Sequence, residues 1–372
     1  PGGIVVLGQE QGLSPRNAAF TMGAFGNPLE MDDVDRGAIL HPGPIIIPAA
    51  IVAAQVAQAS PAALIDGIIR GYDATVRLGR TVGPGHYAHF HNTATCGPIG
   101  ATVAAAHILG LTPDQTVSAM GNALTQSAGL WACRHEDVMA KQVHTAHAAE
   151  VGLASALLAR AGVTGARRAL EGPQGFYEGL CPDPAPERLL IEPELWRIHE
   201  VSFKPWPACR HCHPAIDAAL ILRDRIGSVD AVKRVTISVY ADASLFCDKP
   251  GPDTTIAAKF SLQHAVALTL ADGPPDLDGF ETEARSRPDL IRLRGLSDVQ
   301  VDPELSRAYP ARFGAEVAIE LTDGRILSER RHDAAGDPEL PLDDATLTGK
   351  AHGLMLWGGL AAADADRLIG AC

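Results

Sequence analysis

The stretch Thr145-Ala-His-Ala-Ala-Glu-Val-Gly-Leu-Ala-Ser-Ala-Leu-Leu-Ala-Arg-Ala161 decides the fold class of the first half of the chain. Alanine and leucine are strong helix formers, and Gly162 follows them as a natural left-handed stop. The stretch therefore predicts one long helix, and Gly165–Leu170 resembles a short helix after it.

The residues before this helix carry further helical signals. Thr112-Pro113-Asp114 combines a cap residue, a first-turn proline and a first-turn acid ahead of apolar residues at helical spacing. Residues 45–57 are strongly apolar despite Pro48, but they are shorter than the roughly 20 residues of a membrane span. Long strand-like runs are missing between Asn17 and about Leu170, so this half is expected to be helical.

The pattern changes after the proline-rich residues 181–187. Val232–Tyr240 alternates apolar and polar residues as a half-buried strand does. Residues 317–330 predict a hairpin, because Asp323-Gly324 suits a tight turn between two apolar runs. Helical patterns cover residues 213–225 and 257–271.

A chain of 372 residues exceeds the usual limit of a single core, so two domains are expected. We predict a mostly α protein in which a large all-helical domain, residues 1–198, is completed by the helical residues 339–372. Residues 199–338 are predicted to form a smaller α+β lid domain.

Composition excludes several classes of partner. The net charge of -13 offers no basic field for nucleic acid or for an anionic membrane surface. No secretory signal precedes the first helix, and no apolar run is long enough to cross a membrane. The seven cysteines are scattered and odd in number, which favours a reducing cytoplasm over a disulfide scaffold: Cys96, Cys133, Cys181, Cys209, Cys212, Cys247 and Cys372.

Four segments gather ionisable side chains that could carry chemistry: residues 32–43, 86–96, 141–147 and 204–213. His91 lies just before a helical pattern, where free backbone N–H groups favour anions and an imidazole can exchange protons near neutral pH. Taken alone, such a histidine is more often a cap or a satisfied buried side chain. Lys141 and His144 share a helix face, which fits carboxylate binding as well as it fits an ordinary solvated face.

Cys209-Arg-His-Cys-His213 contains metal-ligand residue types, but the second ligand pair that zinc sites usually have is missing. The phosphate-loop, zinc-protease and serine-hydrolase motifs are missing as well. We therefore expect no metal.

Taken together, the segments resemble the MmgE/PrpD family, which includes 2-methylcitrate dehydratase, cis-aconitate decarboxylase and iminodisuccinate epimerase. The likeness runs nearly from end to end and keeps the order of the motifs. They are Met31-Asp-Asp33 with Leu40-His-Pro-Gly43; Phe90-His-Asn-Thr-Ala-Thr-Cys-Gly-Pro98; Lys141-x-x-His144 with Ala148-Ala149; Lys204-Pro-Trp-Pro207 with His213-x-x-Ile-Asp217; and Ala258-Lys-Phe-Ser-Leu262.

The resemblance implies a homodimer that binds a small polycarboxylate in a cleft between its two domains and needs no cofactor. It implies catalytic roles for His91, His41, Lys141, Lys204 and Asp33. His91 would be the leading proton-transfer group, with His41 as its partner, and the two lysines would bind carboxylates. It implies substrate contacts for four further side chains: His144, Cys209, His264 and Thr93.

The chain departs from the family pattern at three positions. His264 stands where many members have tyrosine, Cys209 where the decarboxylase has histidine, and Val34 where threonine is frequent. The resemblance also implies several helices ahead of the segment that begins at Ile4, and a start without them would weaken folding, dimerisation or activity.

Three functions stay open. The first is a lyase that removes a proton next to a carboxylate of a di- or tricarboxylic acid and then expels water or carbon dioxide. The second is an epimerase of an amino-dicarboxylate such as iminodisuccinate, since the same carbanion can be reprotonated on its other face. The third is a non-catalytic or metal-binding member of the family.

Overall fold

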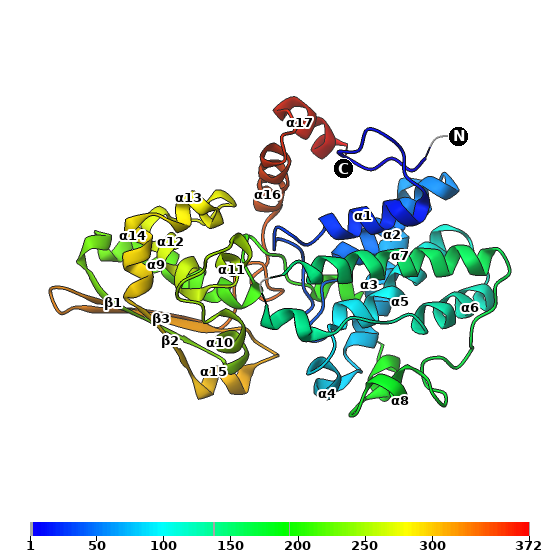
Figure 1. Cartoon of the computed structure of the whole chain (residues 1–372), viewed down its shortest axis with the longest axis horizontal. Coiled ribbons are helices and arrows are strands. Elements are labelled where there is room, and N and C mark those ends of the chain that lie inside the picture. The colour runs from blue at the N-terminus through cyan, green and yellow to red at the C-terminus, as the bar shows by residue number, and fades with distance from the viewer. Residues whose placement is uncertain (1–2, 137, 193, 372) are drawn as a thin grey trace. The chain divides into compact units, whose positions relative to one another are not determined.

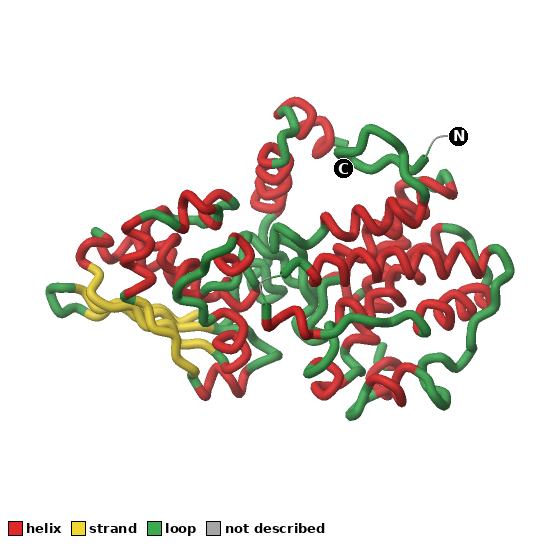
Figure 2. The backbone as a smooth tube through the Cα atoms, viewed as in Figure 1, coloured by secondary structure: helices red, strands yellow, loops and turns green. Residues whose placement is uncertain are grey.

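A computed structural model describes residues 3–136, 138–192 and 194–371. The chain divides into a helical unit, Pro1–Val201, and an α+β unit, Ser202–Cys372. Figure 1 labels most helices and strands of both units, and Figure 2 shows that strands occur within the second. The predicted boundary at residue 198, and the predicted return of residues 339–372 to the helical domain, stay predictions.

The helical unit is built from helices joined by loops, of which residues 26–42 form one of the longest. The helices are α1 (Pro15–Phe25), α2 (Gly43–Ala57), α3 (Pro61–Gly79), α4 (Gly83–Tyr87), α5 (Asn92–Ile108), α6 (Pro113–Leu124), α7 (Ala140–Arg160) and α8 (Phe176–Leu180). Helix α5 packs against α2, α3, α6 and α7, and α1 packs against α2 and α7. Most residues of α5 are buried, so this helix forms the centre of the unit.

Local signals set the helix ends as the sequence predicts. Thr112 caps α6 in a full capping box with Gln115, and Gly162, at φ +96°, follows the end of α7. Helix α7 begins earlier than its apolar pattern, at Ala140. The predicted short helix at residues 165–170 is wrong: a turn stands there, because Gly165 lies against the backbone of α6 at Ser118, where a Cβ atom would come within 2.1 Å of the carbonyl oxygen.

Small residues let α5 and α7 approach closely. A Cβ atom added to Gly152 of α7 would lie 2.3 Å from the Ala101 Cβ and 2.8 Å from the Pro98 carbonyl oxygen of α5. Only glycine fits this crossing without movement of the helices. The apolar residues 45–57 form α2 as predicted, with Pro48 inside the helix.

The α+β unit holds a four-stranded sheet in the order β2-β1-β3-β4. Its strands are β1 (Val232–Val239), β2 (Ser297–Val301), β3 (Ala315–Leu321) and β4 (Ile326–Arg331). Strands β1 and β2 are parallel, whereas the pairs β1–β3 and β3–β4 are antiparallel. The predicted hairpin is confirmed as β3–β4, and Gly324 supplies the positive φ of its turn, at 88°.

The unit also contains helices, and the one predicted over residues 213–225 is confirmed as α9. They are α9 (His213–Ile226), α10 (Ala241–Cys247), α11 (Thr255–Lys259), α12 (Leu262–Asp272), α13 (Thr282–Arg285), α14 (Pro288–Gly295), α15 (Pro303–Ala308), α16 (Asp344–Trp357) and α17 (Ala362–Gly370). Helix α9 packs on β3 and β4, and α12 contacts β2 and α14. The helix predicted over residues 257–271 is interrupted, because the Ser261 side chain caps a new helix, α12.

The mostly α fold class is thus confirmed. None of the helices within the described residues is long and apolar enough to cross a membrane. Six cysteines are free thiols, and Cys372 lies outside the described residues.

Candidate active site

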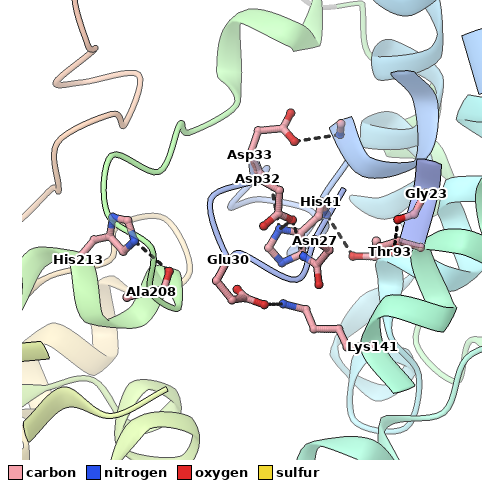
Figure 3. A network of polar contacts seen from close by, with 12 residues as sticks. Gly23, Asn27, Glu30, Asp32, Asp33, His41, Thr93, Lys141, Ala208 and His213 are labelled. Atoms are coloured by element: carbon pink, nitrogen blue, oxygen red, sulfur yellow. Dashed lines mark hydrogen bonds and ion pairs between the residues drawn. The ribbon is translucent and has the colours of Figure 1, made fainter. Parts of the chain in front are cut away.

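The loop between α1 and α2 places His41 against two acceptors. The imidazole Nδ1 lies 2.9 Å from the Asp32 carboxylate and 2.8 Å from the Asp33 carbonyl oxygen (Figure 3). Both neighbours accept hydrogen bonds, so Nδ1 carries the hydrogen, and Nε2 of the neutral ring keeps its lone pair. In this tautomer the Nε2 atom of His41 is the one that can accept a hydrogen bond.

Two further hydrogen bonds hold the His41 backbone and the Asp32 carboxylate in place. The Thr93 hydroxyl, on the first turn of α5, accepts the His41 backbone N–H at 3.1 Å. The Asn27 amide donates to the same Asp32 oxygen at 2.6 Å. Thr93 therefore holds the backbone of His41, and Asn27 and His41 together orient the Asp32 carboxylate.

The Asp33 carboxylate points away from His41 and accepts hydrogen bonds from residues of α2 and α3. Its carboxylate accepts the Tyr72 hydroxyl at 2.7 Å and the Gly43 N–H at 2.9 Å, at the start of α2. Burial raises the pKa of Asp33, and the hydrogen bond from Tyr72 opposes that rise. The side chain ties α2 and α3 to the loop, and its predicted catalytic role stays a prediction.

His91 is the residue that precedes α5, and its side chain is almost fully buried. Its backbone N–H donates to the Gly129 carbonyl at 2.9 Å, and its ring centroid lies 4.3 Å from that of Trp131. The Nδ1 atoms of His91 and His144 are 3.1 Å apart, so one of these nitrogens donates to the other. The His91 and His41 ring centroids are 6.4 Å apart.

Burial lowers the pKa of His91 well below its usual value, and the neighbouring His144 and Lys141 lower it further. Burial also lowers the pKa of His144, and the nearby His147 and Lys141 lower it further. Both imidazoles are therefore neutral at neutral pH and leave Lys141 as the cation of this group.

Lys141 and His144 lie on the first turns of α7, as their spacing predicts. The Lys141 ammonium pairs with the Glu30 carboxylate, with Nζ and Oε1 2.5 Å apart (Figure 3). His147 lies one turn further along and reaches the Gln126 carbonyl with Nε2, at 3.4 Å. The helical unit thus brings together His41, His91, Lys141 and His144, which we call the His–Lys cluster.

Three predicted residues belong to the α+β unit. Lys204 is fully buried there, and so is most of Cys209, whose backbone N–H donates to the Lys259 carbonyl at 2.8 Å. His264 accepts from Arg294 at Nδ1, 3.0 Å away, and donates from Nε2 to the Gly279 carbonyl at 2.9 Å. Both ring nitrogens of His264 therefore have internal partners, so the structure gives it a packing role, whereas its predicted substrate contact stays a prediction.

The histidines of the 209–213 segment also have internal partners. His211 bonds the Tyr240 hydroxyl through Nδ1, and His213 Nε2 lies 3.0 Å from the Ala208 carbonyl (Figure 3). Among the described residues, the group whose geometry could hold a metal ion is a different one: Asp333, Asp337 and Glu339. The segment that suggested metal binding from its residue types uses its imidazoles for packing and for backbone contacts.

Sequence reasoning missed two carboxylates and one aromatic residue of the cluster. It selected Asp33 from the Asp32-Asp33 pair, although Asp32 is the one that contacts His41. Glu30 and Trp131 carried no motif signal, because their importance depends on contacts over 111 and 40 positions of the chain, with Lys141 and His91 respectively.

The fold and the cluster define a two-unit, mostly α protein whose helical unit brings three histidines and a lysine together. The MmgE/PrpD N-terminal domain matches residues 1–189, and the MmgE/PrpD C-terminal domain matches residues 206–369. The chain therefore belongs to the MmgE/PrpD family, as its motifs predict.

Several curated relatives support this assignment. A cis-aconitate decarboxylase-like protein of Aspergillus oryzae is 28% identical over 87% of this chain and 72% of its own length. The cis-aconitate decarboxylase of Aspergillus terreus is 26% identical over 88% of this chain and 72% of its own. The 2-methylcitrate dehydratase of Cupriavidus necator is 27% identical over 62% of this chain and 50% of its own length.

Proposed function

We propose that this chain is a lyase that acts on a small tricarboxylic acid through a carbanion next to a carboxylate. In a dehydration a base removes a proton and the carbanion expels hydroxide, which leaves as water; in a decarboxylation the loss of carbon dioxide creates the carbanion, which is then protonated. The relatives described above are named as a decarboxylase and a dehydratase, and both names belong to lyases. This favours the lyase over the epimerase alternative, although both pass through a carbanion next to a carboxylate.

The observation that carries the proposal is the pairing of His41 with Asp32 beside the neutral His91 and the cationic Lys141. We assign His41 as the base, because its Nδ1 faces a carboxylate that stabilises the imidazolium formed when Nε2 takes a proton. His91 and His144 have each other as Nδ1 partners instead. These contacts favour His41 as the leading proton-transfer group and His91 as its partner, whereas the resemblance suggests the opposite assignment.

Lys141 and His91 would stabilise the negative charge that forms on the substrate. Loss of the proton builds an enediolate, whose negative charge needs a nearby cation in a site with little water. Lys141 is the cation of the cluster, and its ammonium can hold the carboxylate that becomes the enediolate. When His144 donates to its Nδ1, the neutral His91 has its hydrogen on Nε2 and can donate it to a substrate oxygen without adding a second positive charge next to Lys141.

The test is turnover of the full chain with 2-methylcitrate, citrate and cis-aconitate. Formation of a conjugated double bond raises ultraviolet absorbance, and released carbon dioxide identifies decarboxylation. Turnover of one of these acids is expected, and it should be lost on His41→Gln substitution. Solvent deuterium entering the substrate carbon of an amino-dicarboxylate, with no elimination from any of the three acids, would instead support an epimerase.

Cofactor independence, the homodimer and the cytoplasmic location are proposals that accompany this one. The chemistry above uses side chains of this chain alone, and dialysis against a chelator is expected to leave turnover unchanged. Size-exclusion chromatography with light scattering tests the dimer.

A further inference from the structure

Glu30 has an unusual position next to the His–Lys cluster. It lies in the loop between α1 and α2, its backbone adopts φ +53°, and its side chain is only 4% exposed. A residue other than glycine is strained in this left-handed region, and a buried carboxylate loses its hydration. Two unfavourable features therefore coincide in one side chain that lies 2.5 Å from the Lys141 ammonium.

Fold stability alone is a weak explanation for this pair. Burying two charges costs hydration that their attraction roughly offsets, so a buried ion pair adds little net stability. Backbone strain of this kind collects at functional sites, where surrounding contacts hold it in place. The Glu30 carboxylate is thus better explained by what it does to Lys141.

The positive charge of Lys141 acts on other members of the cluster. Its ammonium lowers the pKa values of both His91 and His144, which places its positive charge within electrostatic range of both rings. A substrate carboxylate bound next to these rings would be attracted to the same ammonium. Glu30 presents an identical chemical group, a carboxylate, at that ammonium already.

We infer that Glu30 is an internal competitor for Lys141, so that a substrate carboxylate must displace or share the Glu30 carboxylate in order to bind. This inference rests on the proposed function, because it assumes a carboxylic acid substrate. Two carboxylates on one ammonium repel each other, so Glu30 weakens binding and keeps Lys141 neutralised in the empty site. The alternative is that Glu30 only orients Lys141, in which case Glu30 strengthens binding.

The two roles predict opposite effects of Glu30→Gln, which keeps the size of the side chain and removes its charge. If Glu30 is an internal competitor, the Glu30→Gln variant should bind citrate more tightly than wild type, by on the order of tenfold, because one like charge near the ligand is gone. Citrate affinity of the full chain is measured by isothermal titration calorimetry, and KM and kcat with the acid that wild type turns over. We expect KM to fall and kcat to change little.

Two further variants separate the effect from a general change of charge. Glu150→Gln removes a carboxylate that also contacts a cation on the helical unit, Arg16 at 2.7 Å, but lies outside the cluster, and it should leave citrate affinity unchanged. Lys141→Met should reduce the gain from Glu30→Gln, because Glu30 and the ligand then no longer compete for one ammonium and only their direct repulsion remains.

Unchanged or weaker citrate binding by a folded Glu30→Gln variant overturns the inference. If that variant does not fold, Glu30→Asp replaces it: aspartate tolerates the left-handed conformation but is one methylene shorter, so its carboxylate reaches Lys141 less well and citrate should again bind more tightly. An unchanged affinity for Glu30→Asp also counts against the inference. If wild type turns over a tricarboxylate but Glu30→Gln binds citrate no more tightly, only the competitor role is refuted. If wild type neither binds nor converts any of the tricarboxylates, the proposed function is refuted as well.

Discussion

Replacing Asp32 by asparagine should slow turnover without unfolding the protein. The Asp32 oxygen next to His41 Nδ1 also accepts from the Asn27 amide at 2.6 Å, so two donors point at one atom. An asparagine at this position has to place its own oxygen there, because its NH2 group would face both donors. The variant therefore keeps the His41 tautomer and loses only the negative charge.

The magnitude follows from the separation of the charges. With Asp32 Oδ2 2.9 Å from His41 Nδ1, the centres of the carboxylate and of the imidazolium are about 4 Å apart, and at an effective dielectric constant of about 20 they attract by about 4 kcal/mol. Loss of that attraction in the transition state corresponds to at most about a thousandfold in rate. We expect kcat to fall by about 100- to 1,000-fold, with little change in KM.

The assay is steady-state turnover of the tricarboxylic acid that wild type uses, together with thermal unfolding of each variant. Asp66→Asn is the matched control, since Asp66 also contacts a histidine, His107 at 2.7 Å, but on the exposed side of α3. It should keep wild-type kinetics. An Asp32→Asn variant that is folded and retains more than half of kcat would refute the role of Asp32 and, with it, the assignment of His41 as the base.

Three further predictions concern stability. Tyr72→Phe should lower the free energy of unfolding by about 1–3 kcal/mol in urea titrations, because buried Asp33 loses the hydroxyl that donates to it at 2.7 Å. Gly152→Ala should cost about 1–3 kcal/mol in the same titrations, because the new methyl group would lie 2.3 Å from Ala101. Burial lowers the pKa of His264 to about 4, so as pH falls from 6.5 the unfolded chain binds the proton first and stability is lost. At pH 5 this loss is about 2 kcal/mol relative to pH 7.5, and a His264→Gln variant should show a weaker dependence on pH over that range.

Helix ends could be predicted where the signal is local. Thr112, Pro113 and Gln115 form their cap within one turn, and the Asp323-Gly324 turn likewise depends on neighbouring residues. The prediction of a helix at residues 165–170 was wrong because their conformation is set by packing against α6, which is distant in sequence. Propensity carries no information about such a contact.

The site shows the same division. The motifs located His41, His91, Lys141 and His144, and these four side chains do lie together in the helical unit. Their pairing could not be predicted, because the choice of carboxylate depends on the path of the loop between α1 and α2. That path turns one acid of the Asp32-Asp33 pair toward His41 and the other toward Tyr72.

The close crossing of α5 and α7 has a consequence for how this site can change. His91 stands at the start of one of these helices and His144 near the start of the other, and Gly152 allows the two backbones to touch. Any larger side chain at the crossing would push the helices apart and carry both imidazoles with them. New substrate preferences are therefore more accessible through substitutions in the 26–41 loop, which bears the acids that contact His41 and Lys141, than through substitutions in the helices that hold His91 and His144.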